Sequence, residues 1–270
     1  MRPMSLRFLM LLVPLRIGIS LGGPFWSVNR IVLVVKAYKF LISIALKRPI
    51  ATEVELEYLS KKFRLVLRSS VELALIREIF LDDEYKHETV QDAETIFDVG
   101  ANIGMASIYF ACIYPDAKIY AFEPDPQVFA RLKDQVSSFE NIIPMQMALG
   151  GTDGTRNFYI HPESILSGSL IERVGGQQQV TVPSRKISTL VEELELGNVD
   201  LLKFDIEGGE RELFENEEDR KCVANLVGEV HLDILNCTKE EFEGLFPEFN
   251  TVYTRRINDR RYLFTGVKKV

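Results

Sequence analysis

The sequence predicts an α/β protein with a doubly wound, mostly parallel sheet and an N-terminal helical extension. From residue 95 onward, short apolar runs typical of strands alternate with amphipathic runs typical of helices. The chain has 270 residues, 46% of them hydrophobic, which suits one large α/β domain with an appendage. Acidic residues followed by glycines end two of the strand-like runs, a pattern expected at the ligand-binding edge of such a sheet.

The chain divides by sequence character into a basic apolar extension (1–52), a lead-in subdomain (53–94) and a main domain (95–270). The expected elements are an antiparallel pair 54–68, helix 71–80, strand 95–99, helix 104–113, strand 117–122, helix 126–137, strand 142–147, hairpin strand 156–160, extended segment 180–183, helix 188–194 capped by Ser188, strand 199–204, helix 208–216, strand 226–231, helix 238–246, and strands 249–254 and 261–267. The last two strands form a hairpin, which places an antiparallel strand in the sheet. Residues 161–179, rich in Ser, Gly and Gln, are expected to form a loop.

An acid and a glycine loop follow the first strand of the main domain. The loop from Asp98 through Gly100, Asn102 and Gly104 reads G-x-N-x-G, and lacks the glycines that let a dinucleotide pyrophosphate approach the backbone. A ligand with adenosine and no phosphate, such as S-adenosylmethionine (SAM), does not need them. Glu123 ends the next strand-like run about 20 residues further on, a spacing that suits a carboxylate bound to both ribose hydroxyls.

Asp98 is then expected near the cationic methionine end of that ligand, where a negative charge is favourable. The alternative interpretation is that Asp98 only caps a helix and that Glu123 is an ordinary loop acid.

A second acidic constellation follows the strand at 199–204. Asp205 and Glu207 both face the cleft only if the backbone leaves strand geometry between them, and the two glycines that follow make such a turn easy. Glu229 and His231 alternate onto one face of the next strand, so the four side chains are expected to converge.

This cluster suits a general base for methyl transfer to a hydroxyl. The same groups alternatively suit a divalent cation that acidifies the hydroxyl, and metal dependence stays undecided. Lys203 would orient a carboxylate or neutralise an anionic substrate. The competing interpretation is a set of acids placed at the positive end of a helix.

These motifs together resemble the FkbM family of SAM-dependent methyltransferases. The resemblance rests on D-V-G-A-N-I-G at 98–104, F-E-P at 122–124, A-L-G at 148–150, L-K-F-D-I-E-G at 202–208 and E-x-H at 229–231. It implies a class I SAM-methyltransferase (Rossmann-like) fold, whose seven-stranded sheet has an antiparallel last strand. It also implies O-methylation, often of a hydroxyl on a carbohydrate, a glycolipid or a secondary metabolite. Position by position, it assigns Asp98, Gly100, Asn102, Gly104 and Glu123 to the SAM site, and Asp205, Glu207 and His231 to the substrate side. Ala148 and Leu149 of the A-L-G motif are added to the predicted cofactor site, and Lys203 to the predicted catalytic group.

The charge of the chain is divided unevenly. The net charge is −7, yet residues 1–52 hold eight Lys or Arg and no acid. The acidic body argues against a nucleic-acid partner. Within the basic extension, 26–47 is expected to be a helix with a polar stripe of Lys36, Lys39, Ser43 and Lys47. Its opposite face, Ile31, Val34, Val35, Tyr38, Leu41, Ile42 and Ala45, is expected to contact a membrane surface or to pack on protein.

The three cysteines form no C-x-x-C pair and are expected to be reduced, as in a cytoplasmic protein, and a zinc site is not expected. A signal peptide within the first 25 residues is the less favoured alternative. Two other functions compete with the methyltransferase. One is a membrane-associated nucleotide-sugar glycosyltransferase, for which Asp205-Ile-Glu207 and Glu123-Pro-Asp125 are the nearest matches to D-x-D. The other is a non-catalytic SAM-binding module.

Overall fold

The structure is a computed structural model in two compact units, residues 1–84 and 85–270. It describes residues 13, 15–17, 20–21, 28–46, 50–160, 168–170, 178–257 and 260–269. The expected loop 161–179 lies mostly outside the described residues, and its last two residues belong to a strand. The division at residues 52 and 94 stays a prediction.

The first unit combines a long helix, a two-stranded antiparallel sheet and a shorter helix. Its elements are α2 (Val28–Ala45), β1 (Thr52–Tyr58), β2 (Lys61–Leu67), α3 (Ser70–Ile76) and the π-helix η1 (Arg77–Leu81). The predicted antiparallel pair is confirmed, with Val54 opposite Leu65. The hydroxyl of Ser69 accepts from the Glu72 amide and so starts α3, because it satisfies an otherwise unpaired helix N–H.

The predicted faces of α2 agree with the structure only in part: Lys39 is exposed as expected, but Ser43 and the apolar face are not placed as packing on protein would require. Its buried side is formed by Leu33, Ala37, Phe40 and Ser43. Ser43, expected on the polar stripe, is buried. Its hydroxyl donates to the carbonyl of Phe40, so the buried polar group has a partner. Small and aromatic side chains pack closely here, whereas Ile31, Val35 and Ile42 of the expected apolar face stay exposed. Lys47 lies outside the described residues.

No helix in the described part of the chain is both long and apolar enough to cross a bilayer. Contact of residues 26–47 with a membrane surface stays a prediction.

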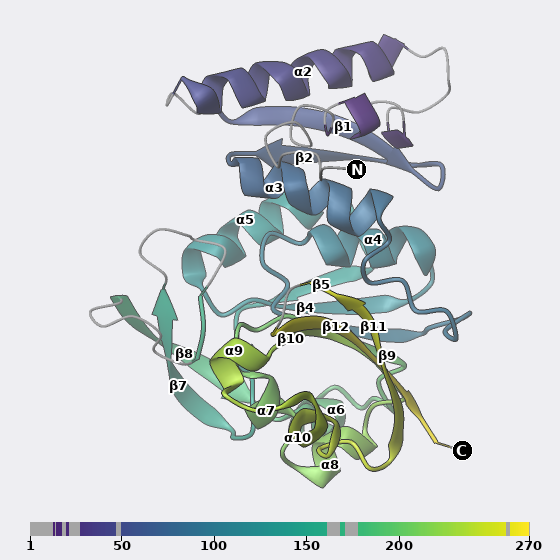
Figure 1. Cartoon of the computed structure of the whole chain (residues 1–270), viewed down its shortest axis with the longest axis vertical. Coiled ribbons are helices and arrows are strands. Elements are labelled where there is room, and N and C mark those ends of the chain that lie inside the picture. The colour runs from purple at the N-terminus through teal and green to yellow at the C-terminus, as the bar shows by residue number, and fades with distance from the viewer. Residues whose placement is uncertain are drawn as a thin grey trace, which may run out of the picture. The chain divides into compact units, whose positions relative to one another are not determined.

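The second unit is built on a seven-stranded sheet with the order β11-β12-β10-β9-β3-β4-β5 (Figure 1). The strands are β3 (Thr95–Val99), β4 (Lys118–Phe122), β5 (Ile142–Met145), β9 (Leu201–Phe204), β10 (Asn225–His231), β11 (Phe249–Arg256) and β12 (Arg261–Lys268). The pairs among β5, β4, β3, β9 and β10 are parallel, and β12 is antiparallel to both of its neighbours. This confirms the predicted mostly parallel sheet with an antiparallel last strand.

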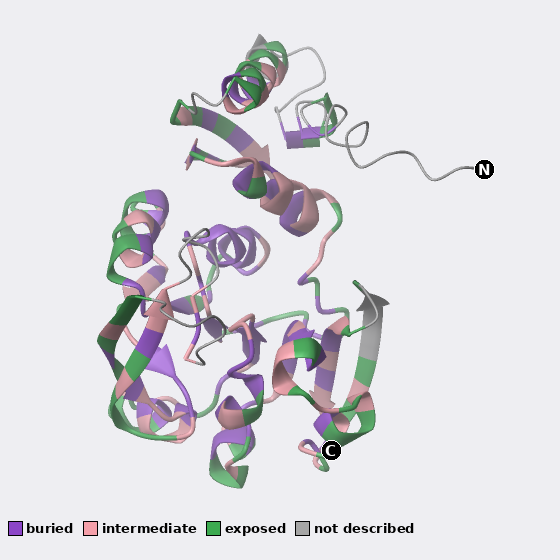
Figure 2. Cartoon of the chain, turned by 60° about the vertical axis from the view of Figure 1, so that its left-hand side comes forward, coloured by how far each residue is buried: buried purple, intermediate pink, exposed green. Residues whose placement is uncertain are grey.

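Helices cover both faces of this sheet. Those labelled in Figure 1 include α4 (Met105–Ile113) and α5 (Pro126–Val136) on one face and α6 (Ile187–Glu193), α8 (Glu217–Lys221) and α10 (Lys239–Glu243) on the other. Residues 105–112 of α4 are all buried, so this helix is covered on every side. Buried residues fill the centre of the second unit in Figure 2. A three-stranded sheet, β6 (Ala148–Leu149), β8 (Gln178–Arg185) and β7 (Gly154–Ile160), stands beside the main one.

Two predicted details differ from the structure. The helix α6 begins after Lys186, which provides no side-chain cap, and Ser188 instead donates its hydroxyl to Asp219. The helix expected over 208–216 is the single turn α7 (Glu210–Leu213), because Glu207 and Gly208 both adopt positive φ, which a helix cannot include. The three cysteines are free, as expected.

The chain order of the strands reverses between β3 and β9. From β3 the chain proceeds to β4 and β5 on one side, and from β9 to β10 and β12 on the other. In open α/β sheets a crevice for ligands forms at such a switch point, beyond the carboxyl ends of the strands. Asp98, Glu123 and Asp205 lie at or just beyond three of these ends.

Candidate active site

A pocket opens beyond the carboxyl ends of β3, β4 and β9, with about 660 Å³ of space between and in front of its walls, part of it open solvent. Its walls combine apolar side chains with a few carboxylates, which is typical of small-molecule sites. It is lined by Val99, Gly100, Asn102, Phe122, Glu123, Pro124, Asp125, Met147, Ala148, Leu149, Phe158, Gly168, Leu170, Asp205, Ile206 and Glu207. Five of the seven residues predicted for the cofactor line it, and Asp98 and Gly104 do not.

The glycine loop lies close to the segment that follows β9. Gly100 has a φ of +74°, and a Cβ at this position would lie 2.0 Å from the carbonyl oxygen of Asp205. Only glycine allows this approach of the two backbones. The amides of Gly100 and Ala101 donate to the carbonyl of Phe122, which fixes the loop on the end of β4. The loop therefore presents backbone, rather than side chains, to the pocket.

Glu123 is held at the pocket wall by the backbone. Its Oε2 accepts from the amide of Asn102 at 3.0 Å, and its Oε1 accepts from the amide of Asp125 at 2.8 Å. Burial raises the pKa of Glu123 to about 8, against the opposing effect of these amides and of the Lys203 charge. Each carboxylate oxygen has a second lone pair, so the group can still accept two hydroxyl hydrogen bonds from a ligand.

Asp98 and Lys203 form a buried ion pair. Lys203 Nζ lies 3.0 Å from Asp98 Oδ1 and donates to the carbonyl of Gly100 at 2.9 Å. The hydroxyl of Ser107 donates to Asp98 Oδ2 at 2.6 Å. The two side chains are 0% and 3% exposed, so the structure places both behind the pocket wall. Their contacts hold the glycine loop in place.

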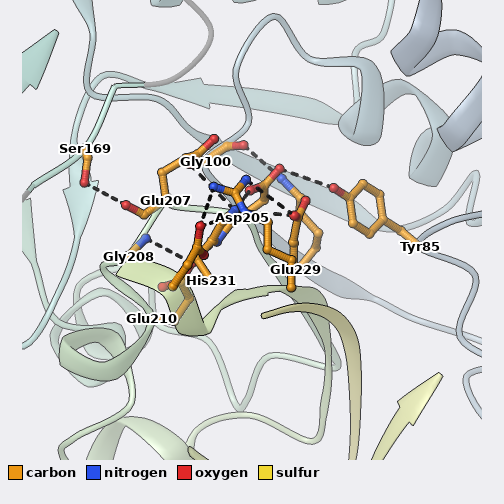
Figure 3. Close-up of polar contacts among 12 residues, drawn as sticks. Tyr85, Gly100, Ser169, Asp205, Glu207, Gly208, Glu210, Glu229 and His231 are labelled. Carbon is orange, nitrogen blue, oxygen red and sulfur yellow. Dashed lines mark hydrogen bonds and ion pairs between the residues drawn. The ribbon is translucent and has the colours of Figure 1, made fainter. Parts of the chain in front are cut away.

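Four carboxylates surround the imidazole of His231 (Figure 3). On one side, Glu210 Oε1 lies 2.6 Å from Nδ1. On the other side, Nε2 faces Glu229 Oε1 at 3.5 Å, Glu207 Oε2 at 3.7 Å and Asp205 Oδ1 at 3.9 Å. The predicted convergence is confirmed. Glu207, with a φ of +52°, is the residue at which the backbone leaves strand geometry.

The electrostatics of this cluster favour a positive charge on His231. Burial alone would lower the pKa of its imidazole, but the hydrogen bond with Glu210 and the charges of Glu210, Asp205 and Glu229 raise that pKa to about 9. A protonated imidazole is a poor proton acceptor. The carboxylates of Asp205 and Glu207, which line the pocket, are therefore the better candidates for a base.

Two contacts of the cluster were not assigned from the sequence. Glu210 is 0% exposed and also accepts a hydrogen bond from the Gly208 amide. The hydroxyl of Tyr85 donates to Asp205 Oδ2 at 3.4 Å across 120 residues of sequence, a contact that no local pattern signals.

The comparison with family models decides the assignment. The Methyltransferase FkbM domain matches residues 98–255, more than half of the chain. This chain belongs to the FkbM methyltransferase family. It is thus a SAM-dependent methyltransferase, and the glycosyltransferase alternative is excluded.

Three named methyltransferases are similar to part of this chain. Methyltransferase sdnD of Sordaria araneosa is 30% identical over 60% of this chain and 76% of its own length. The 31-O-demethyl-FK506 methyltransferase FkbM of Streptomyces tacrolimicus is 27% identical over 58% and 74%. The hexuronic acid methyltransferase AglP of Haloferax volcanii is 27% identical over 63% and 71%.

Proposed function

We propose that this protein transfers the methyl group of SAM to a hydroxyl of a carbohydrate, a glycolipid or a secondary metabolite. The observation that carries the proposal is the pair of carboxylates, Asp205 and Glu207, on the wall of the same pocket as Glu123. A hydroxyl becomes a good nucleophile only when its proton is removed, and a carboxylate within reach can take it. The names of two relatives, which refer to 31-O-demethyl-FK506 and to a hexuronic acid, support acceptors of this kind.

SAM, when bound, supplies an electrophilic methyl group on a sulfonium. We assign its ribose to Glu123 and its adenine to the apolar wall that includes Phe122, Met147 and Leu149. The donor set fits: Glu123 is a buried carboxylate that suits a diol, and the loop offers close backbone approach at Gly100. Among the described residues, no cluster of basic side chains lines the pocket to hold a phosphate. Asp98 and Lys203 act indirectly, by holding the glycine loop.

The acceptor hydroxyl lies, in this proposal, between the sulfonium and the two carboxylates. Its oxygen bonds to the methyl carbon as the carbon–sulfur bond breaks, the proton passes to Asp205 or Glu207, and the sulfur leaves as a neutral thioether. The apolar walls exclude water, which strengthens these electrostatic interactions.

The function is tested first by ligand binding and then by transfer. In a thermal-shift screen, S-adenosylhomocysteine (SAH) is expected to raise the melting temperature, and NAD and UDP are not. Methyl transfer from radiolabelled SAM is then measured against uronic acids, neutral sugars and polyketide alcohols. Transfer only to nitrogen or carbon acceptors would contradict the proposal, and SAH binding without any transfer would favour the non-catalytic module.

The pKa of Glu123 gives a pH prediction for cofactor binding. Two ribose hydroxyls donate to the ionised carboxylate, so SAH binding should expel the proton that Glu123 carries below about pH 8. The affinity for SAH is therefore expected to rise by up to about tenfold per pH unit from pH 6 to pH 8, and then to level off. Calorimetric titration at several pH values measures this.

The variant Glu123→Gln is the control for this prediction. It cannot ionise, so its weaker affinity for SAH should not change over the same pH range. An identical slope in the variant and in the unmodified protein would assign the pH dependence to another group.

A further inference from the structure

The cluster around His231 has the composition and spacing of a metal site. One ligand atom from each of Asp205, Glu229 and His231 lies within 4.8 Å of the other two. The sheet register brings them together, because Gly228 pairs with Phe204 and the residues that follow on the two parallel strands, Glu229 and Asp205, then lie side by side. Strand alternation places His231 on the same face as Glu229.

An independent observation at the imidazole points to a ligand. Nε2 of His231 is buried and has no hydrogen-bond partner among the described residues, and the side chain is 1% exposed. It is aimed at the carboxylates of Glu229, Glu207 and Asp205, as Figure 3 shows. Burial of a ring nitrogen without a hydrogen-bond partner costs free energy, so the unpaired state of Nε2 needs an explanation.

The distances suit coordination better than hydrogen bonding. Nε2 lies 3.5, 3.7 and 3.9 Å from the three carboxylates, beyond the range of an N–H···O bond. Two ligand atoms that are each about 2.1 Å from one ion lie about 3.0–4.2 Å apart, depending on the angle at the ion. The space between Nε2 and the carboxylates therefore matches the space that an ion would fill.

The remaining contact of the imidazole prepares it as a ligand. Glu210 Oε1 lies 2.6 Å from Nδ1, and Glu210 itself is fully buried. A carboxylate on the far nitrogen fixes the proton there and directs the lone pair of Nε2 outward, as the outer shell of metal-bound histidines does. Arg261 lies 3.9 Å from Glu229 and also pairs with Asp233.

We propose that Asp205, Glu229 and His231 bind a divalent cation, with Glu207 beside it. One imidazole and two carboxylates form a set that suits Mn²⁺ or a similar first-row ion. The carboxylates that face Nε2 supply the negative charge that a divalent ion needs. Asp205 also lines the pocket, so an open position of the ion faces the acceptor.

The inference rests on the proposed function for the role of the ion. A cation next to the acceptor binds its hydroxyl and lowers the pKa of that group. The proton then passes to Glu207 while the oxygen takes the methyl group.

Mn²⁺ binding to the full-length protein, freed of metal with EDTA, tests the site. The electron paramagnetic resonance signal of free Mn²⁺ should fall until one equivalent is bound. Asp205→Asn and Glu229→Gln should each weaken binding at least tenfold, and the exposed control Glu217→Gln should not. Binding by the unmodified protein that is weaker than about 1 mM, or equal binding by all three variants, would overturn the inference.

Two further measurements keep this test interpretable. Circular dichroism verifies that each variant is folded. Asp205 and Glu229 are partly exposed, so their replacement disturbs the fold less than replacement of the buried His231. SAH titration of the same EDTA-treated protein separates the two proposals. SAH binding without Mn²⁺ binding would overturn the metal site alone, whereas Mn²⁺ binding without SAH binding would overturn the proposed cofactor pocket alone.

Discussion

Replacement of Asp205 by Asn or of Glu207 by Gln is expected to lower kcat by about 10²–10⁴-fold. Each substitution keeps the shape of a side chain on the pocket wall but removes its capacity to accept a proton. KM for SAM should change little, because the cofactor is assigned to Glu123 and the glycine loop. Steady-state kinetics with the best acceptor from the transfer screen measures both constants.

The two carboxylate variants also differ from each other in an informative way. Asp205→Asn should lose both kcat and Mn²⁺ binding, whereas Glu207→Gln should lose kcat and keep most of the Mn²⁺ affinity. The matched control is Glu217→Gln, which replaces an exposed carboxylate that pairs with Lys221 on the surface. Full activity in both site variants would refute the assignment of the base.

Replacement of Lys203 by Met is expected to reduce the free energy of unfolding by about 3–5 kcal/mol. The substitution leaves Asp98 fully buried with only the hydroxyl of Ser107 as a partner. It also removes the bond to the Gly100 carbonyl, so affinity for SAH should fall together with stability. Urea unfolding followed by circular dichroism measures the first effect, and calorimetry the second.

A double variant separates the charge from the packing of this pair. Asp98→Asn combined with Lys203→Met should recover part of the lost stability, because no uncompensated charge remains buried. Lys221→Met removes an exposed lysine from a surface pair and should have no measurable effect. If Lys203→Met were as stable as the unmodified protein, the buried pair would not be what holds the loop.

The sheet and its ligand edge were predictable because they follow from local patterns. Apolar runs that end in Asp98, Glu123 and Asp205 define three parallel strands, and their carboxyl ends share one edge of the sheet. The glycines after Glu207 predicted that the backbone would turn there. The structure shows that Glu207 itself adopts the left-handed conformation, which no propensity favours.

Other features depended on pairings between strands, which sequence periodicity does not contain. Lys203 was expected to orient a carboxylate or to neutralise an anionic substrate, and the register of β3 and β9 places it opposite Asp98, with which it pairs. Glu210 and Tyr85 contact the cluster across long stretches of chain. The buried face of α2 was missed because Ala37 and Ser43 pack closely, whereas the larger Ile31 and Ile42 remain exposed. Hydrophobicity alone does not report shape complementarity.

The most direct test of the account is an experimental structure of the protein with SAH. We expect the ribose hydroxyls on Glu123, the adenine on the apolar wall beside Leu149, and the sulfur directed toward Asp205 and Glu207. Density for SAH in another part of the protein, or a ribose without contact to Glu123, would contradict the assignment of the pocket and the transfer chemistry that depends on it.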